Sequence, residues 1–324
     1  MKAKHVIIYL LLVIVTSSCI RDEAPNAEAD ILSCRLPGIT MTTSPIINNN
    51  SVTLFVTPGT NISALAPEFT LTSGATITPA SGTERNFNSP QEYQVTAADG
   101  IWKKTYAISV IDTELATIYN FEDTISGKKY YIFVERENDK VIMEWASGNA
   151  GYAMTGVAKT ADDYPTFQIA NGKNGKCLSL VTRSTGFFGG LVGMPIAAGN
   201  LFIGSFDVNN AMSNPLQATK FGLPFRHVPT YLAGYYKYKA GDQFTEGGKP
   251  VEGKHDICDI YAIMYETSVS VPTLDGTNAF TSPNLVSMAR IKDAKETDEW
   301  TYFKLPFTTL PGKFIDKEKL TMGK

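Results

Sequence analysis

The segment of the chain best equipped for ligand chemistry is a tyrosine-rich stretch at residues 231–238. It carries Tyr231, Tyr235, Tyr236 and Tyr238. Successive side chains of a β-strand point to opposite faces, so Tyr236 and Tyr238 share one face and the other two tyrosines share the second. Exposed aromatic rings can stack on the apolar C–H faces of sugar rings, while polar neighbours fix the hydroxyl groups. We predict that one face packs in the core and the other offers a carbohydrate platform, with Tyr235, Tyr236 and Tyr238 as candidate contacts.

Three further side chains are candidates for the same kind of contact. Trp145 ends an apolar strand pattern, and Arg226 and His227 lie in a loop flanked by prolines. The N–H groups of arginine and histidine can hydrogen-bond ligand hydroxyls. For each aromatic residue, packing inside the sandwich is the competing interpretation, because aromatic residues are favoured in sheets.

Signals for catalysis are weaker than signals for binding. Hydrolysis of glycosides needs two carboxylates that face each other across a cleft. Carboxylates occur at several positions, but none of them lies in a recognisable motif; they include Asp162-Asp163, Asp256, Asp259, Glu266, Asp298 and Glu299. No GxSxG sequence and no Cys/His nucleophile pattern is present. The sequence therefore favours a protein that is not an enzyme, and it leaves a carboxylate-pair enzyme as the alternative.

The start of the chain has the layout of a secretory signal. Lys2 and Lys4 precede an apolar run at residues 6–15, which is shorter than the roughly 20 residues that a membrane-spanning helix needs. Small residues follow, and then Cys19. This arrangement resembles the lipobox of bacterial lipoproteins, although Thr16 stands where leucine is commoner. The resemblance implies that residues 1–18 are a signal peptide and that Cys19 becomes the lipidated N-terminus. An ordinary signal peptide with an incidental cysteine is the alternative.

Residues 19–30 are predicted to form a flexible, lipidated tether. The stretch behind residue 23 is rich in Ala, Glu, Pro and Asn. Asp22 and Glu23, close behind Cys19, resemble the surface-export signal of lipoproteins in glycan-degrading gut bacteria. The resemblance implies an outer-membrane protein that faces the cell exterior and contacts the membrane through its lipid only.

The charge of the chain limits the classes of ligand that the protein is expected to bind. The formal net charge is −3 and the sequence has no stripe of basic residues, so we do not expect the protein to bind nucleic acids.

Cys34, Cys177 and Cys258 remain after lipidation, and an odd number of cysteines cannot all pair within the chain. Their spacing does not suggest a zinc site. A chain of 324 residues with 43% hydrophobic residues is expected to form two domains with real cores.

The first domain is predicted at residues 31–112 as an immunoglobulin-like β-sandwich. Val52 and Leu54 alternate with polar residues, and a hairpin is predicted to turn at Asp99-Gly100. That hairpin, at residues 93–110, resembles the closing hairpin of immunoglobulin-like repeats in bacterial surface lipoproteins. The resemblance implies a spacer or a module that contacts other surface proteins.

The second domain is predicted at residues 115–324 as a larger, all-β jelly roll, because strand patterns recur without long amphipathic helices. The candidate strands are residues 129–134, 141–145, 177–182, 201–208, 232–239, 257–266 and 299–307.

Four segments of this second domain carry a family resemblance. They are residues 119–123, 232–241, 256–266 and 300–307. They resemble the "putative carbohydrate metabolism domain" of bacterial surface lipoproteins. The resemblance implies a galactose-binding-like jelly roll akin to carbohydrate-binding modules, with no required cofactor. By analogy, Glu122 and Asp123 are candidate ligands of a structural calcium ion. The resemblance also implies two further strands after Lys324, so we expect a truncated sequence or an exposed sheet edge.

These patterns predict a cell-surface lipoprotein that binds a glycan or polysaccharide for capture or utilisation. Two alternatives stay open at this point. One is a glycoside-acting enzyme with a carboxylate pair in the jelly roll. The other is a structural or adhesive, fimbria-like surface protein that pairs strands through its immunoglobulin-like module or its open edge.

Overall fold

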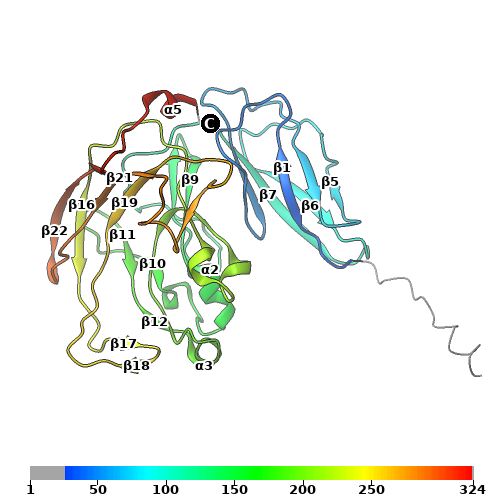
Figure 1. The fold of residues 1–324 in the computed structure, drawn as a ribbon. Helices are drawn as coiled ribbons and strands as arrows, with labels where there is room; N and C mark the ends of the chain where they lie inside the picture. Colours follow the sequence, from blue (N-terminus) through cyan, green and yellow to red (C-terminus); the bar gives the residue numbers. More distant parts are fainter. Residues whose placement is uncertain (1–25, 323–324) are drawn as a thin grey trace, which may run out of the picture.

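Two β-rich bodies follow one another along the chain in the computed structural model, which describes residues 26–322 (Figure 1). The predicted signal peptide, the lipidation site Cys19 and residues 20–25 of the predicted tether lie outside the described residues. Strands dominate both bodies and the helices are short. The predicted all-β sandwich class is therefore confirmed.

The first domain pairs a five-stranded sheet with a two-stranded one. The larger sheet has the order β2-β3-β7-β6-β5, in which β3 and β7 run parallel and the other pairs are antiparallel. The smaller sheet pairs β1 with β4. The strands are β1 (Ile31–Arg35), β2 (Ile46–Ile47), β3 (Ser51–Phe55), β4 (Glu68–Leu71), β5 (Thr76–Thr78), β6 (Gln91–Thr96) and β7 (Lys103–Ile111).

The core of this domain follows from the alternation seen in the sequence. Val52, Leu54 and Tyr93 are fully buried, and Tyr106 and Ile108 lie beside them in the same cluster. The predicted hairpin is confirmed by the antiparallel pairing of β6 with β7. Its turn contains Gly100 at a φ of 71°, a left-handed conformation that glycine adopts without steric cost.

The second domain is assembled from several small sheets. The largest has the order β20-β15-β14-β9-β8, and a three-stranded sheet has the order β19-β21-β23. Two-stranded pairs are β10-β11, β12-β13, β16-β22 and β17-β18. The strands of the largest sheet are β8 (Val134–Glu137), β9 (Lys140–Ala146), β14 (Phe202–Phe206), β15 (Thr219–Phe221) and β20 (Leu274–Asp275). The others are β10 (Thr166–Ile169), β11 (Cys177–Leu180), β12 (Arg183–Ser184), β13 (Ile196–Ala197), β16 (Tyr231–Tyr238), β17 (Thr245–Glu246), β18 (Lys249–Pro250), β19 (Tyr261–Tyr265), β21 (Leu285–Arg290), β22 (Thr297–Pro306) and β23 (Thr308–Thr309).

Short helices punctuate the second domain. They are α2 (Asn149–Tyr152), η1 (Ala153–Thr155), η2 (Ala161–Asp163), α3 (Gly186–Leu191), η3 (Val208–Asn210), α4 (Pro215–Ala218) and α5 (Lys317–Met322). Within residues 26–322, none of the helices has the length and apolar character needed to cross a membrane.

One predicted strand is displaced in the structure. The pattern at residues 129–134 predicts a strand, yet β8 begins only at Val134. The ring of Tyr130 packs on Tyr164 at a centroid distance of 5.1 Å, and the hydroxyl of Tyr131 donates to Asp162 at 3.0 Å. Both tyrosines therefore serve side-chain contacts in a turn, and only an isolated bridge between Phe133 and Thr124 precedes the strand.

The first described residues are held to the first domain by a charged hydrogen-bond network around Asp30. Its carboxylate accepts hydrogen bonds from the Lys104 ammonium at 2.5 Å and the Tyr106 hydroxyl at 3.0 Å. The hydrogen bond from Lys104, aided by that from Tyr106, holds the pKa of Asp30 below its ordinary value against the effect of burial.

We predict that Asp30→Asn lowers the free energy of unfolding of the first domain by about 1 kcal/mol at pH 7. That is below the usual value for a charged hydrogen bond, because the Asp30 side chain is 42% exposed. The folded-state pKa lies below the unfolded one, so the stabilisation is complete above the unfolded pKa and is lost as the pH falls through the folded pKa. Urea denaturation of both proteins should therefore show a difference at pH 7 that shrinks steadily below about pH 4. Glu28→Gln is the control, and an equal difference at pH 7 and pH 3 would contradict the role of the charge.

Candidate functional site

The tyrosine-rich segment forms β16, which pairs antiparallel with β22 in a two-stranded ribbon. Exposed and half-buried residues alternate strictly along β16. Tyr231 and Tyr235 lie on the exposed face, and the register sets Tyr235 directly opposite Tyr302 of β22. These three rings are 52%, 48% and 55% exposed, respectively. The strand prediction is confirmed, and the two faces differ in the way that its alternation requires.

The exposed rings form one surface, which we call the tyrosine face and define by Tyr231, Tyr235, Trp300 and Tyr302. The ring centroids of Tyr235 and Tyr302 lie 5.2 Å apart with an interplanar angle of 53°. Tyr231 lies four residues before Tyr235 on the same strand, or roughly 13 Å away at the usual rise per residue. The half-buried Trp300 lies two residues before Tyr302 on β22. An extended ligand can therefore meet several rings in succession along the ribbon.

Lysine side chains accompany the rings of this face. The Nζ atom of Lys304 lies 3.9 Å from the ring centroid of Tyr231, and that of Lys173 lies 4.2 Å from the centroid of Tyr235. The Nζ atom of Lys237 lies 5.5 Å from the centroid of Trp300. Lys173 comes from the loop between β10 and β11, so two separate parts of the domain contribute to the face.

The other face of β16 packs against the domain, and two of the predicted contact residues lie there. Tyr236 is half-buried, donates its hydroxyl to the carbonyl of Lys295 at 3.3 Å, and lies 6.2 Å from the ring of Phe303. Burial raises the pKa of Tyr238 to about 12, and the nearby charge of Asp256 adds to the shift. Of the three tyrosines proposed from the sequence, the structure thus leaves Tyr235 on the open face.

Close packing on that inner face depends on a glycine. A Cβ atom built on Gly234 would lie 2.9 Å from the ring of Phe303, its direct partner on β22. The ring of Phe303 therefore occupies the space beside the Gly234 backbone. This contact holds the ribbon with its tyrosine face outward.

Trp145 lies elsewhere, in an aromatic cluster at the start of the second domain. Its ring lies 4.9 Å from Tyr119 and 5.5 Å from Phe121, and its indole Nε1 donates to the carboxylate of Glu135 at 2.8 Å. Trp145 is half-buried and engaged on several sides. Its position therefore agrees with the competing interpretation, in which Trp145 packs inside the sandwich and does not contact a ligand.

The carboxylate of Glu135 has an unusual environment for an acid. Desolvation raises its pKa, the hydrogen bond from Trp145 acts in the opposite direction, and the nearby charge of Asp123 raises the pKa further. The same aromatic surroundings raise the pKa of Tyr119 to about 12, mainly through burial. The negative charge of Asp123 is therefore close enough to influence Glu135. Sequence reasoning did not single out Glu135, because the partner that perturbs it lies on another segment.

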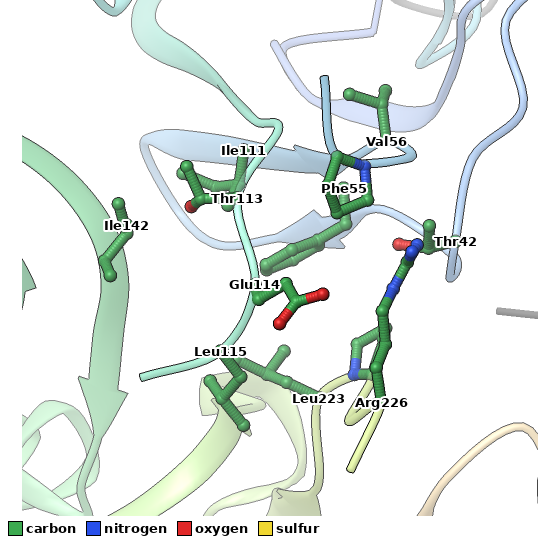
Figure 2. A pocket seen from close by; sticks show the side chains of 12 residues that line it. Thr42, Phe55, Val56, Ile111, Thr113, Glu114, Leu115, Ile142, Leu223 and Arg226 are labelled. Atoms are coloured by element: carbon green, nitrogen blue, oxygen red, sulfur yellow. The ribbon is translucent and has the colours of Figure 1, made fainter. Parts of the chain in front are cut away.

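Arg226 and His227 lie at the junction between the two domains. Neither residue belongs to the paired strands β16 and β22. His227 Nε2 lies 2.9 Å from the carboxylate Oε2 of Glu114 in the connecting segment. Arg226 lines a pocket that contains Phe55 of the first domain and Leu223 of the second (Figure 2). The structure therefore assigns both residues contacts that link the domains.

A charged pair strengthens this junction. The ammonium of Lys140 on β9 donates to the carboxylate of Asp112, the residue that directly follows β7. Both side chains are largely shielded from solvent, with 27% and 22% exposure. The two domains are thus joined by this ion pair, by the contact between His227 and Glu114, and by the residues that line a shared pocket.

The candidate calcium ligands Glu122 and Asp123 lie close to other polar groups. The Glu122 carboxylate accepts the backbone N–H of Lys176 at 2.9 Å, and the Asp123 carbonyl accepts that of Val134 at 3.1 Å. Among residues 26–322, no group of three or more His, Cys, Asp or Glu side chains is arranged to hold a metal ion. The calcium site stays a prediction.

Three residues of the tyrosine face, Tyr231, Trp300 and Tyr302, were absent from the predicted contacts. Trp300 and Tyr302 belong to a segment already expected to be a strand, and their alternation places them on one face. The missing information was the partner strand, because the pairing of β22 with β16 brings together residues that are 59 to 75 positions apart in the sequence.

Comparison with known proteins covers both domains. The model of the family described as "Putative carbohydrate metabolism domain" matches residues 120–323, and the model described as "SGBP, N-terminal" matches residues 31–110. No curated protein matches the chain.

Two solved structures are similar over much of their length. A protein of Bacteroides thetaiotaomicron, described as a putative glycoside hydrolase, is 84% identical. The match covers 94% of this chain and 89% of that one, with a TM-score of 0.90. A second protein of the same description, from Bacteroides vulgatus, is 48% identical over 63% of this chain and 84% of its own, with a TM-score of 0.59.

Proposed function

Because the chain belongs to the "putative carbohydrate metabolism domain" family and carries an SGBP N-terminal domain before it, we propose that it is a surface lipoprotein that binds glycans. A glycan-related function is common to both matches. The observation that supports binding is the tyrosine face, where Tyr231, Tyr235 and Tyr302 are each about half exposed on one side of a two-stranded ribbon.

The physical argument rests on what exposed rings do in water. A large exposed aromatic surface is costly to leave hydrated, and clustered exposed apolar groups mark interaction sites. Tyr235 and Tyr302 are direct cross-strand partners, so their backbones hold the rings in a fixed relation. Sugar rings have apolar C–H faces that fit such a platform, and the phenol hydroxyls and lysine ammonium groups beside it can bond to sugar oxygens.

We predict that Tyr235→Ala and Tyr302→Ala each weaken glycan binding at least about tenfold, because each substitution removes a ring at the centre of the contact surface. A glycan array identifies the ligand, and isothermal titration with that ligand measures the loss. Tyr236→Phe is the matched control, since it removes only the hydroxyl that donates to Lys295 on the packed face. Equal affinities of Tyr235→Ala and the unsubstituted protein would contradict the tyrosine face as the site.

A second candidate function is glycoside hydrolysis, and the environment of Glu135 favours it. A carboxyl whose pKa is raised keeps its proton to a higher pH than an ordinary one and can act as a general acid, and Asp123 supplies a second carboxylate nearby. Both solved relatives are described as putative glycoside hydrolases.

On this second candidate, the protein should release reducing ends from the glycan that it binds, and Glu135→Gln should lower the rate at least about a hundredfold. Since the acid form is the active one, the rate should fall as the pH rises above the pKa of Glu135. Asp162→Asn, on η2, is the control. If the protein binds the glycan without releasing reducing ends, the result would contradict hydrolysis and would still support binding.

The cellular location is part of the proposal. The SGBP N-terminal match indicates a protein of the cell surface, and the signal pattern ahead of Cys19 accounts for export and anchoring. We infer that the mature chain begins at a lipidated Cys19 in the outer membrane and faces the exterior.

We predict that Cys19→Ser moves the protein from the membrane fraction to the soluble fraction and abolishes its labelling with a fatty-acid analogue. Cys258→Ser is the matched control and should leave both properties unchanged, because lipidation requires the cysteine behind the signal segment. Labelling that survives Cys19→Ser would show that the anchor is attached elsewhere.

A further inference from the structure

The lysines of the tyrosine face indicate which class of glycan it selects. Lys304 and Lys173 place their ammonium groups about 4 Å from the ring centroids of Tyr231 and Tyr235, so each cation lies over a ring that a sugar would otherwise cover. A ligand that stacks on these rings must also lie next to the two positive charges. We propose that the ligand is an acidic glycan, with carboxylate or sulfate groups that engage these lysines. This inference rests on the proposed glycan-binding function.

The lysines of this face are not neutralised by ion pairs. Among the described residues, none of Lys173, Lys237 and Lys304 forms an ion pair with a carboxylate. The paired lysines are Lys104, Lys140, Lys220, Lys254, Lys295 and Lys319. The chain as a whole has a formal net charge of −3. The ammonium groups of these three lysines are therefore available to anionic groups of a ligand.

The acidic residues of the ribbon lie at one end of it. Asp298 and Glu299 come before Trp300 on β22, whereas Lys304 lies near the other end of that strand. Tyr302, between them, is opposite Tyr235, the ring that Lys173 covers. Lys304 therefore lies toward the end of the ribbon that is remote from these carboxylates, and Lys173 lies over a ring near its middle.

The lysines approach the rings from two directions. Lys237 and Lys304 are fixed on the ribbon itself, and Lys173 reaches Tyr235 from the loop between β10 and β11. Contact with a ring limits the freedom of each ammonium group, so less conformational entropy is lost when a ligand binds. A neutral sugar would gain stacking alone. An acidic sugar gains stacking together with charge-assisted hydrogen bonds, which are roughly twice as strong as neutral ones.

The test begins with an array that contains acidic glycans and neutral glycans of matched backbones, probed with the full chain. We expect the bound glycans to be acidic. Arms that carry uronic acid without sulfate, and sulfate without uronic acid, distinguish the two sources of negative charge. Binding of the selected glycan should weaken steeply as the salt concentration rises, because the attraction is between exposed charges.

Substitutions then assign the effect to the face. Lys173→Met and Lys304→Met keep most of the aliphatic stem and remove the charge, and each should weaken binding of the acidic glycan roughly tenfold, the effect of losing one charged hydrogen bond. Lys249→Met, on the exposed β18, is the matched control and should have no effect. Loss of salt dependence in the double variant Lys173→Met/Lys304→Met is a readout that a folding defect would not produce.

The outcomes separate this inference from the function beneath it. Selective, salt-insensitive binding of neutral glycans through Tyr235 would overturn the acidic ligand and leave the glycan-binding function intact. Acidic glycans bound equally well by the lysine variants would overturn the role of the face in charge selection. Absence of any bound glycan, with circular dichroism showing a folded protein, would overturn both.

Discussion

The pairing of β16 with β22 is the contact on which the candidate site depends. Side chains alternate along a strand with a period of two residues, so a register slip of one residue would move every tyrosine to the opposite face. The observed register places Tyr235 opposite Tyr302 on the exposed side and Gly234 opposite Phe303 on the packed side. Because a Cβ at Gly234 would collide with the Phe303 ring, the inner contact is specific to this register. The packing of one face therefore positions the rings of the other.

The sequence could predict the strands and their faces but could not predict which segments meet. Alternation in residues 231–238 correctly separates Tyr231 and Tyr235 from Tyr236 and Tyr238, because alternation is a local property of the backbone. Whether a face is open depends on packing from distant segments, which is why Tyr236 and Tyr238 were candidates on equal terms with Tyr235. Tyr302 comes from another strand and Lys173 from a loop. A single sequence does not show which distant segments lie next to each other.

The same limit explains the displaced candidates. Arg226 and His227 have the hydrogen-bonding groups that a sugar site needs, but the partner of His227 is Glu114, more than a hundred residues earlier. Trp145 ends a strand as expected, and its exposure is decided by Tyr119, Phe121 and Glu135 around it. The residue type described the chemistry available in each case. The neighbours, set by the tertiary fold, decide whether that chemistry serves a ligand or the structure.

The first domain separates the start of the described chain from the second domain. The amide of Asp99, in the turn between β6 and β7, donates to the carbonyl of Asn26, so the chain enters this domain beside that turn. β7 then runs from Lys103 to Ile111, a length of roughly 26 Å, and ends at the junction. There the ion pair between Asp112 and Lys140 and the contact between Glu114 and His227 join it to the second domain. Entry and exit thus lie at opposite ends of one strand (Figure 1). Because the strand is held in a five-stranded sheet and the junction is held by these two charged contacts, the first domain sets the distance between its own N-terminal end and the second domain.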